Sequence, residues 1–168
     1  MTRRALIIGI SSLVFAAALL GCGSSSPKDS SDWSYNRPDG FKQQDKQKNG
    51  ATVFLGPKDD GFQSNLLVKA GTNWKDNAKK IGEDTLARFK SDSSVTVKEQ
   101  EPYTVPDSDA YTWLISKKLR SGVTASQRQF LVMKNGIVVE FTMTASDKEF
   151  TKYDQALADS LQSFKWGR

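Results

Sequence analysis

Two alternating segments joined by Asn135-Gly136 constrain the fold of this chain more than any other feature. Residues 127–134 and 137–144 flank the dipeptide, and Asn-Gly is the preferred pair for a two-residue type I′ hairpin. The apolar face of this hairpin carries Phe130, Val132, Ile137, Val139, Phe141 and Met143, and the opposite face carries Gln129, Glu140, Thr142 and Thr144. Phe130 is then opposite Phe141, so register and apolar pattern agree. The chain therefore contains an antiparallel sheet.

Further short runs predict more strands. The expected strands are residues 51–55, which Gly56-Pro57 ends, 66–68, which Gly71 ends, 95–103, and 110–119. Pro102 restricts the third to a sheet edge or an irregular end. A turn is expected at Pro38-Asp39-Gly40, where Pro presets φ and Gly tolerates a positive φ.

Two amphipathic helices are expected. Asn73 is the predicted N-cap of the first, whose apolar side recurs at Trp74, Ala78, Ile81, Leu86 and Phe89. Ser146 and Glu149 have the spacing of a capping box for the second, which presents Phe150, Tyr153, Leu157, Leu161 and Phe164 on one side. The order of strands, helix, four strands and helix predicts an α+β fold: a twisted antiparallel sheet flanked by helices.

The first 21 residues have the pattern of a secretory signal. Arg3 and Arg4 precede a run without charge that reaches Leu20. This run is shorter than the ~20 residues that a membrane-spanning helix needs. Removal of residues 1–21 removes Arg3 and Arg4, so the formal net charge falls from +5 to +3. The sequence therefore predicts export from the cytoplasm.

Leu19-Leu20-Gly21-Cys22 resembles the lipobox of bacterial lipoproteins. The resemblance implies cleavage between Gly21 and Cys22 and acylation of Cys22, with diacylglyceryl and acyl groups holding the protein to the cell membrane or the outer membrane. The alternative is an ordinary secreted protein with a free cysteine. Residues 22–32 are then the lipidated cysteine and a flexible tether rich in Ser and Gly, and residues 33–168 form one globular domain.

Composition excludes several classes of site. The chain has no His and a single Cys, which excludes Ser-His-Asp and Cys-His catalysis, disulfides within the chain, and metal sites built on imidazole or several thiolates. No Lys/Arg block interleaved with aromatics is present, so nucleic acid is not an expected partner. We expect no cofactor and no metal.

Two acidic segments are candidate sites. Asp59-Asp60-Gly61 offers oxygens for Ca²⁺, yet its spacing is not that of an EF-hand loop, so a solvated turn is favoured. Asp107 and Asp109 form a carboxylate pair for acid–base chemistry, but without a partner motif they are interpreted as a loop.

Basic and aromatic residues supply a candidate partner surface. Lys117, Lys118, Arg120 and Arg128 are expected to cluster where one strand ends and the next begins, facing lipid headgroups, an acidic partner or solvent alone. Trp33, Tyr35, Trp113 and Trp166 are expected in the core or at its rim. If Trp33 and Trp166 lie together, they form an aromatic patch suited to a partner.

The element order and aromatic placement resemble the PsbP/Mog1-like group, also called DcrB-like. The features that carry the resemblance are Trp33 and Tyr35 before Pro38-Asp39-Gly40-Phe41, the middle helix, the Asn135-Gly136 hairpin, and a last helix ending at 160–164. It covers residues 33–166 and implies a central antiparallel sheet between helices, an α/β/α sandwich. It also implies a non-catalytic, accessory role, and no functional residue is carried over.

These observations together predict a lipid-anchored, non-enzymatic envelope protein that binds an unidentified envelope protein outside the cytoplasm. The first alternative is a carrier of a small apolar ligand or lipid, which requires a closed cavity above ~300 Å³. The second is a hydrolase without His, which has little support because G-x-S-x-G and S-x-x-K are absent from the expected mature domain.

Overall fold

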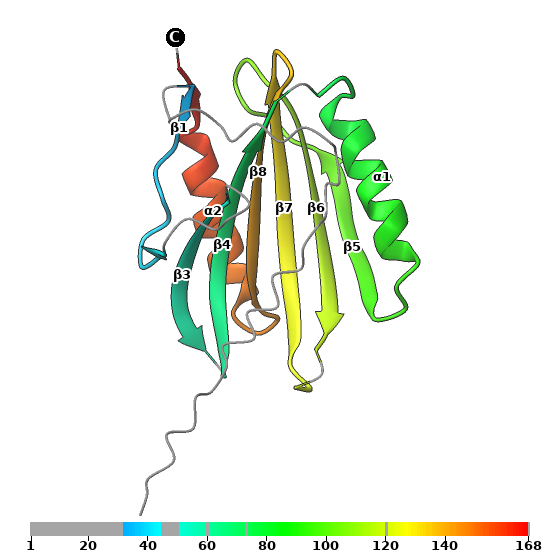
Figure 1. Ribbon diagram of the computed structural model, residues 1–168. Helices are drawn as coiled ribbons and strands as arrows, with labels where there is room; N and C mark the ends of the chain where they lie inside the picture. The colour runs from blue at the N-terminus through cyan, green and yellow to red at the C-terminus, as the bar shows by residue number, and fades with distance from the viewer. Residues whose placement is uncertain (1–31, 45–50, 60, 73, 120, 168) are drawn as a thin grey trace, which may run out of the picture.

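The computed structural model describes residues 32–44, 51–59, 61–72, 74–119 and 121–167. Its elements are β1 (Trp33–Ser34), β2 (Lys42–Gln43), β3 (Thr52–Asp59), β4 (Phe62–Gly71), α1 (Ala78–Lys90), β5 (Val95–Pro102), β6 (Asp109–Lys118), β7 (Thr124–Lys134), β8 (Ile137–Ser146), α2 (Phe150–Gln162) and β9 (Lys165–Trp166). Seven strands form one antiparallel sheet in the order β2-β3-β4-β8-β7-β6-β5 (Figure 1). The predicted α+β class is confirmed.

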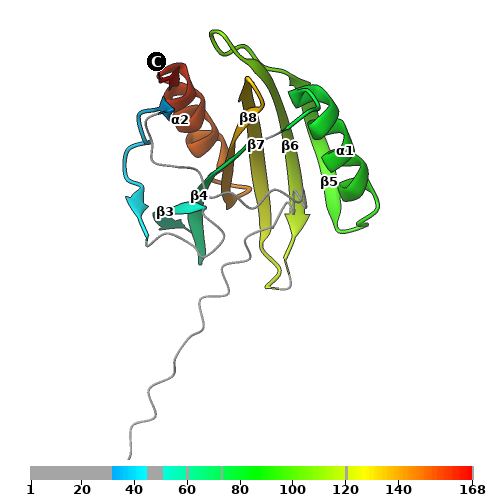
Figure 2. The same ribbon diagram turned by 45° about the horizontal axis from the view of Figure 1, so that its top comes forward.

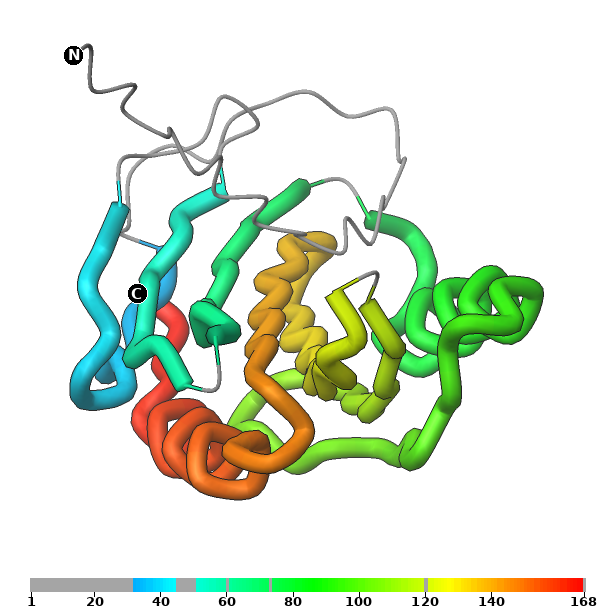
Figure 3. The backbone as a smooth tube through the Cα atoms, turned by 90° about the horizontal axis from the view of Figure 1, so that it is seen from below, coloured from blue at the N-terminus to red at the C-terminus, as the bar shows by residue number. Residues whose placement is uncertain are grey.

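Helices cover both faces of this sheet. Because side chains alternate along a strand, Phe130 and Val132 of β7 pack with α2, whereas Leu131 and Met133 pack with α1. Figure 3 shows α1 and α2 on opposite sides of the strands. The sheet therefore separates two hydrophobic cores, as a sandwich requires.

The Asn135-Gly136 hairpin has the predicted register. Both residues have positive φ, 51° and 74°, and Lys134 is paired with Ile137 and Phe130 with Phe141. The polar side chains of the hairpin lie on the face opposite its apolar side chains, as predicted, and this is the face on which α1 packs. They are nevertheless buried, including Gln129 and Glu140.

Helix α1 begins later than the sequence predicts. Its N-cap is Asn77, whose Oδ1 accepts from Lys80 N at 2.8 Å. Asp109 Oδ2 accepts from Ala78 N at 2.7 Å, so a distant strand satisfies another donor at the helix start. Trp74 precedes the helix, and the predicted cap Asn73 lies outside the described residues.

Gly56-Pro57 does not end β3, contrary to prediction. The strand continues to Asp59, and a register shift between Leu55 and Lys58 accommodates the dipeptide. Strand β2 pairs only with Phe54 and Leu55, so Pro57 lies beyond its reach and its missing N–H loses no β2 partner. The neighbouring β4 is also longer than predicted.

The predicted capping box at Ser146 and Glu149 is wrong. Ser146 is the last residue of β8, where it pairs with Ala125, and α2 starts at Phe150 after Glu149, which makes no side-chain cap bond. Sheet pairing therefore holds Ser146 in an extended backbone conformation, and Ser146 does not serve as the N-cap of α2.

The two ends of the described chain meet. Strand β9 pairs with β1, with Trp33 opposite Trp166, and the C-terminal residues lie beside β1 in Figures 1 and 2. The sequence did not indicate β9. Neither described helix is long and apolar enough to cross a bilayer.

Candidate functional site

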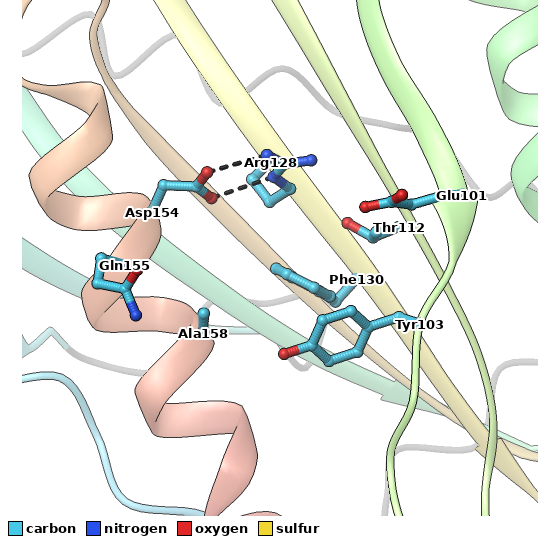
Figure 4. Close-up of a pocket in the computed structure, with 8 residues that line it drawn as sticks. All are labelled: Glu101, Tyr103, Thr112, Arg128, Phe130, Asp154, Gln155 and Ala158. Carbon is cyan, nitrogen blue, oxygen red and sulfur yellow. Dashed lines mark hydrogen bonds and ion pairs between the residues drawn. The ribbon is translucent and has the colours of Figure 1, made fainter.

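A cleft of about 150 Å³ lies between α2 and the β5–β7 side of the sheet. Its lining residues are Glu101, Tyr103, Thr112, Arg128, Phe130, Asp154, Gln155 and Ala158 (Figure 4). The strands supply the floor, because Thr112, Arg128 and Phe130 are buried. Helix α2 supplies one wall, and Glu101 and Tyr103 supply the other (Figure 4).

Arg128 is the central charged group of the cleft. Its Nε and Nη2 donate to the two carboxylate oxygens of Asp154 at 3.1 and 2.9 Å, as Figure 4 shows. Nη2 also lies 2.7 Å from Glu99 Oε2. Burial opposes the charged form, but the hydrogen bonds and charges of Asp154 and Glu99 raise the pKa of Arg128. The guanidinium is therefore fixed in place and permanently charged.

An aromatic pair lies beside this ion network. The rings of Tyr103 and Phe130 meet edge to face, with centroids 4.7 Å apart. Burial raises the pKa of Tyr103, and the charges of Asp154 and Asp159 raise it further against the effect of Arg128. The phenol is therefore neutral at physiological pH and can donate or accept a hydrogen bond.

The chemistry of the cleft suits recognition. Its lining combines an aromatic edge, a fixed cation and the exposed carboxylate of Glu101. Its lining residues include no Ser, Cys or Lys, and its hydroxyl and carboxylate groups are those of Tyr103, Thr112, Glu101 and Asp154. Its volume is about half of the ~300 Å³ expected for a carrier.

Asp154→Ala is expected to lower the free energy of unfolding by about 2 kcal/mol, because a buried charged donor loses two hydrogen bonds while Glu99 remains. Urea unfolding measures the change. Asp159→Ala is the matched control on the same helix, where the exposed carboxylate accepts from Gln155; its effect should stay within about 0.5 kcal/mol. Equal losses in both variants would show that Arg128 does not depend on Asp154.

The aromatic half of the predicted partner surface is brought together. Trp33 and Trp166 are cross-strand partners, and Trp33 stacks on Tyr35 with ring centroids 5.9 Å apart. Trp166 Nε1 donates to Ser108 Oγ at 2.8 Å. All three rings are half-buried against the α2 core, so they form its rim.

The basic half lies elsewhere. Lys117 and Lys118 end β6, whereas Ser108, the partner of Trp166, precedes its start, roughly 30 Å away by strand rise. Lys117 Nζ contacts Asp92 at 2.9 Å. Arg128 was expected in this basic cluster, which is wrong: it pairs with Leu114 in mid-strand and is buried. Arg120 lies outside the described residues.

The other sequence candidates have structural roles or lie outside the described chain. Asp109 accepts a hydrogen bond from the backbone at the start of α1, and Asp59 accepts one from the Tyr153 hydroxyl. Trp113 is fully buried in the α1 core. The described residues contain no group of three metal-ligating side chains. Gly21, Cys22 and Asp60 lie outside the described residues.

Sequence reasoning missed the cleft because its residues come from separate elements. Glu101, Tyr103 and Asp154 carry no local pattern that joins them. One signal was present: Arg128 alternates with Phe130 and Val132, which places it on the apolar face. A cation in that position needs a buried carboxylate partner.

The fold of this chain is similar to that of several solved structures. LpqN of Mycobacterium tuberculosis, described as involved in cell envelope biogenesis, superposes with a TM-score of 0.62 at 14% identity over 81% of this chain and 83% of that one. Cyanobacterial PsbP from Synechocystis sp. PCC 6803 superposes with a TM-score of 0.57 at 13% identity over 86% and 98%. The chain has a PsbP-like fold.

A third structure shares the PsbP-like fold. A protein of unknown function from Pseudomonas aeruginosa, described as a putative regulator, has a TM-score of 0.58 at 12% identity over 79% of this chain and 95% of that one. No family model and no curated protein matches the sequence. The predicted PsbP/Mog1-like resemblance is thus confirmed as a likeness of fold.

Proposed function

We propose that this chain is a lipid-anchored protein of the bacterial envelope that serves as a non-enzymatic, protein-binding accessory module. The observation that carries the proposal is the likeness to LpqN, a protein described as involved in cell envelope biogenesis. The Leu19-Leu20-Gly21-Cys22 pattern at the front of the chain supports the same location. The PsbP-like domain is then held outside the cytoplasm.

The position of β1 indicates which end of the domain would face the membrane. Ten residues separate Cys22 from Trp33, and if they form the flexible tether that their Ser- and Gly-rich sequence predicts, their span is about 17 Å. Trp33 and Trp166 lie at the same end of the domain. On this proposal their end lies nearest to the bilayer, and the end with Lys117 and Lys118 points away from it.

Binding, in preference to catalysis, is supported by the composition and by the cleft. The chain has no His, and the cleft offers a fixed ion network and an aromatic edge. Such groups recognise a partner through charge and shape. A cleft of about 150 Å³ does not support the carrier alternative, which requires a closed cavity above ~300 Å³.

Cys22→Ala is expected to abolish fatty-acid labelling and leave the precursor unprocessed, because the thiol that receives the lipid is gone. The measurement is metabolic labelling of bacterial cells with an alkyne fatty acid, read with the size of the product on a gel. Ser24→Ala is the matched control and should be labelled and processed like the unchanged chain. Labelling that persists in Cys22→Ala would refute the anchor.

Crosslinking in intact cells tests the binding role. A photoreactive residue in place of Gln155, at the wall of the cleft, should yield a discrete crosslinked envelope protein by mass spectrometry. The same residue in place of exposed Lys79 on α1 is the control. Identical crosslinks at both positions would count against a defined binding surface.

A further inference from the structure

The cleft between α2 and the β5–β7 side of the sheet carries more negative than positive charge. Its lining includes the carboxylates of Glu101 and Asp154 and the guanidinium of Arg128. Glu99 adds a third carboxylate, 2.7 Å from Arg128 Nη2. Burial is the main cause that raises the pKa of Tyr103, and negative charge on α2 raises it further despite Arg128. The cleft therefore favours a cation over an anion.

The groups at the entrance of the cleft are accessible to a partner. Glu101 and Gln155 are exposed on its two walls, and the side chain of Asp154 is 25% exposed. The access follows from the sheet order, because α2 packs on β7 and β8 whereas β5 is the edge strand. Figure 4 shows Glu101 and Gln155 on opposite sides of the cleft. A side chain from outside can therefore enter between the two walls.

Glu101 is the carboxylate of the cleft that lacks a cation. Both oxygens of Asp154 accept from Arg128, and Glu99 contacts the same guanidinium. Glu101 makes no ion pair with any residue that the structure describes. Its side chain is directed from β5 into the cleft (Figure 4). The cleft therefore presents one negative charge that a positive charge of a partner can neutralise.

A lysine or arginine side chain matches the size and chemistry of this cleft. Its charged end can hydrogen-bond to the Glu101 carboxylate. The ring centroids of Tyr103 and Phe130 lie 4.7 Å apart. Aromatic rings attract cations, and the methylene groups of such a side chain pack on apolar surface. The volume of about 150 Å³ is below the ~300 Å³ at which pockets for whole small molecules begin, so the space fits a single side chain.

We propose that this cleft binds a lysine or arginine side chain on the surface of a partner protein, whose charged end pairs with Glu101 and lies against Tyr103. Charge complementarity selects this occupant. An acidic side chain or a phosphate would meet the carboxylates of Glu99, Glu101 and Asp154, and an uncharged side chain would leave Glu101 unpaired. The inference rests on the proposed protein-binding function and names the chemistry that the partner presents.

Peptides selected on the purified chain from a phage-displayed library of random linear sequences are the probe. The enriched peptides should contain a lysine or arginine. Replacing that residue by norleucine in a synthetic peptide should weaken binding roughly tenfold, as the loss of one ion pair and one cation–π contact predicts. No enrichment, or enriched peptides that bind equally well without the basic residue, would overturn the proposal.

A double-mutant cycle tests whether the basic residue lies in the cleft. Glu101→Gln, at an exposed position, should weaken binding of the selected peptide about fivefold. In this variant the norleucine replacement should weaken binding only about twofold further, because its partner is already gone. Glu83→Gln on α1, also exposed, removes the same charge elsewhere and should change Kd by less than about twofold. Independent effects of the peptide and Glu101 substitutions, or equal effects of the Glu101 and Glu83 variants, would overturn the proposal.

Two further measurements separate this inference from its alternatives. Displacement of the selected peptides by spermidine at equal affinity would assign the cleft to free polyamines and overturn a protein partner. In intact cells, the segment crosslinked to a photoreactive residue at Gln155, on the wall of the cleft, should contain a lysine or arginine. A discrete crosslinked protein whose segment has neither would overturn this inference and leave the proposed binding role standing, so the two failures are distinguishable.

Discussion

Phe141→Ala is expected to lower the free energy of unfolding by about 3–5 kcal/mol. Phe141 is fully buried in the middle of β8. Its ring meets three aromatic rings edge to face. The ring centroids lie 5.0 Å from that of Tyr35, 6.0 Å from that of Phe164 and 6.3 Å from that of Trp33. The substitution therefore leaves a cavity and removes the ring on which the aromatic residues at both chain ends pack.

Urea unfolding monitored by tryptophan fluorescence measures this loss. Ile137→Ala is the matched control, because Ile137 lies on the same face of β8 but is half-buried beside the hairpin; its cost should be about 1 kcal/mol. A loss below about 1.5 kcal/mol for Phe141→Ala would contradict the central position of this ring.

Glu140→Gln is expected to stabilise the protein by about 3 kcal/mol at pH 8 and to have little effect at pH 5. Burial raises the pKa of Glu140 to about 7, against the opposing effects of Lys69 and Thr142. The unfolded chain releases this proton near the ordinary pKa of 4.5. Between these values the folded state binds more protons, so its stability falls as pH rises toward 7.

Urea titrations at pH 5 and pH 8 measure this linkage. The unchanged chain should lose stability between the two values, and Glu140→Gln should lose less by the contribution of this one group. Glu101→Gln, an exposed position on β5, is the control and should follow the unchanged chain. Parallel pH dependence in Glu140→Gln and the unchanged chain would show that Glu140 has an ordinary pKa in the folded state.

Signals that lie within one element were read correctly from the sequence. The Asn135-Gly136 register and the apolar sides of both helices needed only the geometry of a turn or a helix. Signals that depend on a neighbour were read incorrectly. Ser146 follows its pairing with Ala125, and Pro57 is tolerated because β2 does not reach it.

Some contacts of the candidate sites could be predicted from the sequence, and others could not. Trp33 and Trp166 were recognised as a possible pair from their positions at the chain ends, and they are paired. The partners of Arg128 were not recognised, because Glu99 lies 29 positions before it and Asp154 26 positions after it. Nothing in the sequence marks that spacing.

The amino-acid sequence by itself determined the presence of the two helices and of the longer strands, though not their ends, together with the hairpin and the exclusion of imidazole chemistry, because each depends on residues that are close in the chain or absent from it. Tertiary structure alone decided which polar groups are paired. It joins Arg128 to Asp154 and leaves Gln127 without a partner among the described residues. Pairing depends on the distance between side chains in the folded molecule, and the packing of α2 on β7 and β8 sets the distance between Arg128 and Asp154.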